Sequence, residues 1–142
     1  MALSADRFTD RKHGTRENLR SFPVAASTQI YKGGLVALDA SGNLVPGSTA
    51  TTLTAVGVAL QNVDNTSGAA GDLRCETSTA PAAFTSATGG GDDIDGADIG
   101  ATCYIVDDEE VALTDGGSTR SVAGTVFDIG DNGEVFVLPP NV

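Results

Sequence analysis

The apolar residues of this chain occur in short runs, and residues that favour tight turns separate the runs. Three pairs of runs are 35–38 with 44–46, 103–106 with 110–113, and 121–129 with 134–138. The segments between them are rich in Gly, Asn and Asp, which tolerate the backbone angles of a chain reversal. Each pair therefore predicts a β-hairpin. No stretch of about twelve residues has the apolar spacing of a helix packed on a core.

Three further segments have the pattern of strands. Residues 22–26 form the first, and residues 73–77 alternate between apolar and polar side chains, as a half-exposed strand does. Residues 52–60 are apolar on both faces, which predicts a central strand covered on both sides. We interpret residues 62–71 and 78–101 as surface loops, because Gly, Asp and small polar residues dominate them.

Together these segments indicate an all-β protein, a small β-barrel or sandwich of roughly seven to nine short strands. The hairpins resemble one another too loosely to define a sequence repeat, so one compact barrel is favoured. The 18 glycines agree with a fold that has many tight turns, and 142 residues are enough for one core. We expect a single domain over residues 21–142.

The charge of the chain is divided by position. The first twenty residues hold five of its eight Lys and Arg against three acids, a net charge of +2, and leave residues 21–142 with −13. Residues 1–20 also lack an apolar repeat, so we expect an extended basic arm that a partner orders. The candidate contact residues in this arm are Arg7, Phe8, Arg11, Lys12, His13, Arg16 and Arg20.

Charge and hydropathy also bear on the partners. No apolar stretch approaches the roughly 20 residues that span a bilayer, and the first residues lack the apolar centre of a secretion signal. We therefore expect a chain that is made in the host cytoplasm and has no membrane partner. An acidic body repels phosphate, so nucleic acid is not an expected partner either.

Few residues suggest catalysis or ligand binding. His13 is the single histidine and lies in the arm, where no rigid setting for a catalytic base is expected. Cys75 and Cys103 lack CxxC spacing, so we interpret them as small buried side chains. The acidic loop 92–98 lacks the bidentate glutamate of an EF-hand, which favours a solvated loop, with adventitious binding of a divalent cation as the alternative. We expect neither an enzyme nor a cofactor.

Several segments carry a resemblance to a known family. They are Ser-Phe-Pro-Val-Ala-Ala at 21–26, Ile-Tyr-Lys-Gly-Gly-Leu-Val-Ala-Leu-Asp at 30–39, Ala-Val-Gly-Val-Ala at 55–59, Gly-Ala-Thr-Cys-Tyr-Ile-Val-Asp-Asp at 100–108 and Gly-Thr-Val at 124–126. In this order they resemble the head decoration, or capsid cement, proteins of tailed bacteriophages, including proteins encoded beside the major head protein in Mu-like prophages. The resemblance covers residues 20–138.

The resemblance implies a structural role. Members of that family are small β-rich proteins that bind the outside of an icosahedral shell, often as trimers, and stabilise it against internal DNA pressure. It therefore implies a virion protein on the outer capsid surface, with the major capsid protein and further copies of itself, as a homotrimer, for partners. The basic side chains of the arm would pair with acidic groups of the shell, and Phe8 would fill an apolar pocket on it.

An alternative is a carbohydrate-binding or adhesive β module displayed on a particle surface. Sugar binding uses exposed aromatic rings, and the Tyr and Phe residues of this chain lie mostly inside predicted strands, where core packing is expected. A glycan array distinguishes the two hypotheses.

Overall fold

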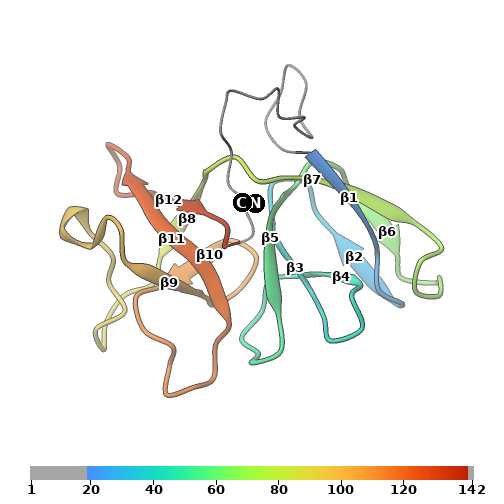
Figure 1. Cartoon of the computed structure of the whole chain (residues 1–142), viewed down its shortest axis with the longest axis horizontal. Coiled ribbons are helices and arrows are strands. Elements are labelled where there is room, and N and C mark those ends of the chain that lie inside the picture. Colours follow the sequence, from blue (N-terminus) through green and yellow to red (C-terminus); the bar gives the residue numbers. More distant parts are fainter. Residues whose placement is uncertain (1–18, 141–142) are drawn as a thin grey trace, which may run out of the picture.

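A computed structural model describes residues 19–140 as an all-β protein, which confirms the predicted fold class (Figure 1). This part of the chain forms twelve short strands and one 3-10 helix, more strands than the sequence predicted. The strands are β1 (Leu19–Pro23), β2 (Thr28–Ile30), β3 (Leu35–Leu38), β4 (Leu44–Pro46), β5 (Thr54–Ala59), β6 (Val63–Asn65), β7 (Arg74–Ser78), β8 (Ala82–Ser86), β9 (Thr102–Ile105), β10 (Glu110–Ala112), β11 (Val122–Ile129) and β12 (Val135–Leu138), and the 3-10 helix is η1 (Gly96–Asp98).

The strands form two lobes that lie side by side (Figure 1). The first lobe contains a five-stranded sheet with the order β1-β7-β5-β3-β4 and a small sheet of β2 and β6. The second lobe is a closed barrel with the order β8-β12-β11-β9-β10, in which β10 pairs with β8 in parallel. A single parallel bridge between Val24 and Leu44 joins β4 to the end of β1 in the first lobe. The first sheet therefore curls towards closure along the same seam that is closed in the second lobe.

The two five-stranded sheets are structural repeats of one another. They have the same strand order, the same pairing directions and the same register at every interface. The equivalent pairs are Phe22–Cys75 and Phe84–Val135, Val58–Ser78 and Thr125–Leu138, Val36–Gly57 and Cys103–Gly124, Leu38–Leu44 and Ile105–Val111, and Val24–Leu44 and Ser86–Val111. The single compact barrel that the sequence favoured is thus replaced by two related five-stranded units.

Strand β5 lies between two hydrophobic clusters, as the apolar character of both its faces predicted. Ala55 belongs to the cluster that fills the closed barrel of the second lobe, which we call the second barrel. Val56 and Ala59 belong to the cluster inside the first lobe. Simple alternation would place Ala55 and Ala59 on the same face. A register shift between β3 and β5 moves Ala59 to the other face, because it inserts one extra residue into β5.

The two lobes share one packed structure. Leu35 and Ala37 of β3 pack with buried residues of the second barrel. The backbone amide of Leu35 donates to the carbonyl of Asp108 at 2.8 Å. The hydroxyl of Ser121 donates to the carbonyl of Ala50 at 2.6 Å. Contacts of this kind hold the lobes in a fixed relation.

Two loop predictions were wrong in part. Strand β6 lies in segment 62–71, and strand β8 and the helix η1 lie in segment 78–101, which we expected to be a surface loop throughout. Phe84 of β8 and Ile94 are buried in the core of the second barrel. Strand β8 forms because β12 and β10 pair with its two edges, and both partners come later in the sequence.

In residues 19–140 no helix has the length and apolar character needed to cross a membrane.

Candidate functional site

Most of the predicted arm contacts lie outside the described residues. These are Arg7, Phe8, Arg11, Lys12, His13 and Arg16. Arg20, which we also placed in the arm, is instead the second residue of β1. Its Nη2 donates to the carbonyl oxygen of Val56 at 3.1 Å, and its guanidinium lies 5.3 Å from the ring centre of Phe22. Arg20 therefore belongs to the body and braces β1 against β5.

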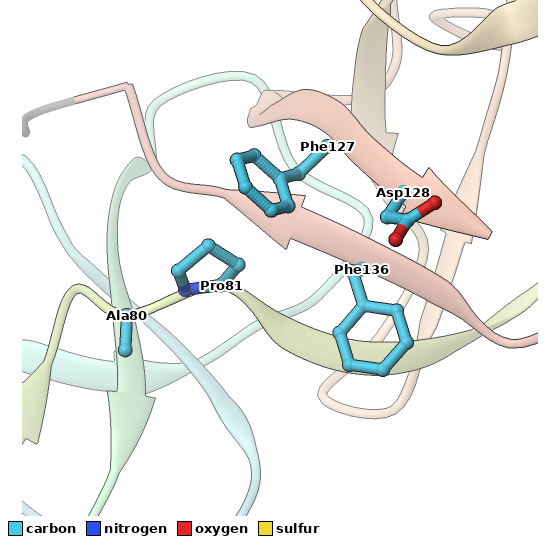
Figure 2. Close-up of a pocket in the computed structure, with 5 residues that line it drawn as sticks. All are labelled: Ala80, Pro81, Phe127, Asp128 and Phe136. Atoms are coloured by element: carbon cyan, nitrogen blue, oxygen red, sulfur yellow. The ribbon is translucent and has the colours of Figure 1, made fainter. Parts of the chain in front are cut away.

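An apolar groove lies beside the connection from β7 to β8. It has a volume of about 420 Å³, and its lining residues are Ala80, Pro81, Phe127, Asp128 and Phe136. Figure 2 shows Phe127 and Phe136 projecting from β11 and β12 on the side of Pro81. Phe127 is 55% exposed, and Phe136 is half-buried. Two aromatic rings and a proline thus offer an open apolar surface with one carboxylate at its edge, a composition typical of docking surfaces.

A β-bulge places Phe127 in the groove. Val126 pairs with Val137 and Asp128 pairs with Phe136, so Phe127 is an extra residue between two paired positions. Alternation along β11 is therefore interrupted, and Phe127 and Asp128 are both exposed. The sequence analysis missed this surface because regular alternation provided no signal of the bulge. The expectation that the aromatic residues lie in the core is wrong for Phe127.

Hydrogen bonds hold the acidic loop 92–98 in place. At Asp92, its first residue, the expectation of a solvated loop is wrong. Nη1 of Arg120 donates to Oδ1 of Asp92 at 3.0 Å, and the hydroxyl of Thr114 donates to the same oxygen. The two charged side chains are only 16% and 17% exposed. The hydrogen bonds from Arg120, and next from Thr114, lower the pKa of Asp92. This pair fastens the loop to the connection between β10 and β11.

The remaining acids of this loop serve the backbone. Asp93 accepts a hydrogen bond from the amide of Gly89 at 3.0 Å. Asp95 and Asp98 form a reciprocal capping box around η1. Within residues 19–140 no group of three or more His, Cys, Asp or Glu side chains is arranged to hold a metal ion.

A second surface hollow, of about 470 Å³, lies where β2 leads into β3. Its lining residues are Tyr31, Lys32, Gly33, Gly34, Asp108 and Glu109. Tyr31 is 63% exposed, so it is a second exception to the prediction of buried aromatic residues. An exposed ring beside carboxylates and a lysine is a combination that can stack on a sugar and hydrogen-bond to its hydroxyls.

Both cysteines are buried and unpaired, as their spacing predicted. Burial raises the pKa of both thiols, and for Cys103 it raises the pKa to about 12. A thiol of this kind is a packing group and not a nucleophile at neutral pH.

Two surfaces, the apolar groove and the Tyr31 hollow, are therefore the candidate sites in the described part of the chain. Comparison of the whole sequence with family models, with curated proteins and with solved structures finds no match.

Proposed function

We propose that this protein is a structural virion protein, a decoration or cement protein that binds the outer surface of a major capsid protein shell and stabilises the head. It acts as a homotrimer, with residues 1–18 of each copy as the anchor on the shell. The role rests on the resemblance to phage decoration proteins and on the arrangement of charge along the chain.

The observation that carries the proposal is that the basic arm is joined directly to a firmly paired strand of the acidic body. Residues 1–18 contain four basic and three acidic side chains, and the rest of the chain contains four basic and sixteen acidic ones. The arm continues directly from β1, which pairs with β7 over its whole length, from Leu19 with Ser78 to Pro23 with Arg74. A basic segment fixed to a rigid acidic body suits recognition of acidic groups on a partner.

A cement protein must hold neighbouring capsid subunits together against outward force, and a rigid fold favours this role. The two lobes share a hydrophobic core, so a force applied to one lobe is transmitted to the other. A trimer brings three arms to the shell at once, and linked contacts bind more tightly than separate ones. Arms that reach different capsid subunits resist separation of those subunits.

The proposal is tested on undecorated shells of the phage that encodes the chain. Purified protein is added, and the temperature at which the shells release their DNA or lose their shape is measured with and without it. The proposal predicts higher stability in the presence of the protein. Equal stability in both samples, at protein concentrations that saturate the shells, would defeat the cement role.

A carbohydrate-binding module displayed on a particle is the second candidate, and the Tyr31 hollow is the observation that favours it. Sugar binding at this place would use the exposed ring of Tyr31 with Asp108 and Glu109 as acceptors for hydroxyl groups. A glycan array probed with the protein and with Tyr31→Ala tests it. Binding that the substitution removes supports the sugar site, and no binding to any glycan excludes it.

A further inference from the structure

Because the two sheets are structural repeats, each groove residue on a strand can be compared with the residue at the equivalent position of the first sheet. Phe136 follows Val135 in the second barrel as Glu76 follows Cys75 in the first sheet, so Phe136 and Glu76 are equivalent positions. Glu76 is exposed to solvent. The fold itself thus accepts a charged residue at this position.

The rest of the groove is also specific to the second barrel. Strand β5 ends at Ala59, which is equivalent to Val126, whereas β11 continues through Phe127 and Asp128 to Ile129. In the first sheet the amide of Leu60, which is equivalent to Phe127, still donates to the carbonyl of Glu76 at 2.9 Å, but the residue pairing of β5 with β7 ends at Ala59. The bulge at Phe127 and the paired residues after it are therefore specific to β11. Two differences between the repeats, the bulged continuation of β11 and a phenylalanine at the position where the first sheet has Glu76, thus form one apolar surface.

We propose that this groove binds the chain's own residues 1–18, with Phe8 packed against Phe127 and Phe136 and with Arg7 and Arg11 beside Asp128. The inference rests on the residues of the groove and of the arm and does not depend on the decoration role. Phe8 is the aromatic residue of the arm, and basic residues lie one position before it and three positions after it. The groove offers the matching pair of properties, an apolar floor and a carboxylate at the edge.

The arm joins the body next to the groove. Leu19 pairs with Ser78, and the groove residue Ala80 is only two positions further along the chain. Figure 1 shows that β1 begins at the same end of the molecule at which the connection from β7 to β8 crosses between the lobes. Phe8 lies eleven residues before Leu19, and a chain of that length can span at most about 36 Å.

Tethering favours the arm of the same chain over that of a second copy. A short flexible tether holds its end at an effective concentration on the order of millimolar. A groove with a dissociation constant of about one millimolar is then about half occupied by its own arm, whereas a second copy at micromolar concentration fills about one site in a thousand.

A paramagnetic label on the arm tests the inference in the full-length chain. Thr9→Cys places a unique reactive thiol beside Phe8, because both native cysteines are buried. With a nitroxide on this thiol, the amide signals of Phe127, Asp128 and Phe136 should lose about half or more of their intensity relative to the reduced label. In a mixture of isotope-labelled protein without nitroxide and unlabelled protein with nitroxide, the same signals should keep their intensity.

Two variants and one control make the result specific. Phe8→Ala and Phe136→Glu should both restore the signals, and Phe136→Glu introduces the residue that the first sheet has at the equivalent position. Tyr31→Glu changes an exposed aromatic residue outside the groove and should leave the loss of intensity unchanged. The inference is overturned if no signal is lost in the first sample or if the loss persists in Phe136→Glu. Equal loss in the mixed sample also overturns it, because the occupant would then be the arm of a second copy.

Discussion

Gly57 and Gly124 occupy the same position in the two repeats and share an unusual backbone conformation. Their φ angles are 125° and 152°, values that residues other than glycine rarely adopt. A Cβ atom on Gly57 would collide with the carbonyl oxygen of Ser78, and one on Gly124 would collide with that of Leu138. Each glycine thus allows a neighbouring strand to approach closely just after the bulge that bends its own strand.

Replacement of either glycine should therefore damage the fold. We expect Gly57→Ala and Gly124→Ala each to lower the free energy of unfolding by at least about 2 kcal/mol, because both backbone strain and a collision result. Urea unfolding measures this. Gly96→Ala is the control, since Gly96 has open space around its Cβ position, and it should change stability by less than about 0.5 kcal/mol. A loss of stability in Gly57→Ala or Gly124→Ala as small as that in Gly96→Ala would contradict the close approach at that glycine.

The hairpins of this fold could be predicted because their signals are local. In the β3–β4 hairpin, for example, the carboxylate of Asp39 accepts hydrogen bonds from the amides of Ser41 and Asn43, and the sequence itself shows the residues that do this. Strand β8 could not be predicted, because its partners β10 and β12 lie far along the chain. The repeat was also hidden, because it is preserved in register and in Gly57 and Gly124 more than in residue identity.

The candidate site was predicted less well than the fold. The bulge at Phe127 leaves no mark on an apolar strand sequence, so its exposure follows only from the pairing with β12. The charge division along the chain was visible in the sequence, but the boundary was misplaced by two residues. Leu19 and Arg20 belong to β1, because β7 provides a partner for them that sequence periodicity does not reveal.

Arg20 should behave as a residue of the body. Loss of its hydrogen bond to Val56 and of its contact with the ring of Phe22 should lower the free energy of unfolding of Arg20→Ala by about 1–2 kcal/mol. Arg16→Ala lies outside the described residues and serves as the comparison, with little change in stability expected. Thermal or urea unfolding of the two variants would show the difference. Equal stability would mean that Arg20 does not brace β1.

Asp92 should make the fold sensitive to acid. Its pKa is lowered from 3.8 in the folded state by Arg120 and Thr114, so the folded protein holds the charged form more strongly than the unfolded chain does. The stabilisation is therefore complete above the unfolded pKa and is lost as the pH falls through the lower folded pKa. Between roughly pH 5 and pH 2, Asp92→Asn should lose less stability than the wild type. Parallel pH profiles from urea unfolding would contradict this.

The two cysteines should be unreactive toward thiol reagents in the native protein. Because burial raises the pKa of Cys75, and raises that of Cys103 to about 12, neither thiol forms appreciable thiolate at neutral or mildly alkaline pH. A thiol-reactive dye should label neither residue in the folded protein and both in denaturant. Rapid labelling of either cysteine in the native protein would contradict the burial of its thiol.

The anchor on the shell should depend on many weak contacts at once. Exposed ion pairs contribute about 0.2–1 kcal/mol each, so Arg7→Ala or Arg11→Ala alone should weaken binding to shells only slightly. Substitution of Arg7, Arg11, Lys12 and Arg16 together should weaken it strongly and should remove most of its salt dependence. Co-sedimentation with shells over a series of salt concentrations measures both effects. A single substitution that abolishes binding would point to one specific contact instead.

The most direct test of the decoration role compares the full-length protein with residues 19–142 on undecorated shells. The shorter chain begins at Leu19 because β1 begins there, so the body keeps all its strands. Bound protein per shell is measured by co-sedimentation. The account predicts saturable binding of the full-length protein in a fixed ratio to the capsid protein, and severe loss of binding by residues 19–142. Absence of binding by the full-length protein would contradict the decoration role, and equal binding of the two chains would assign the anchor to the body.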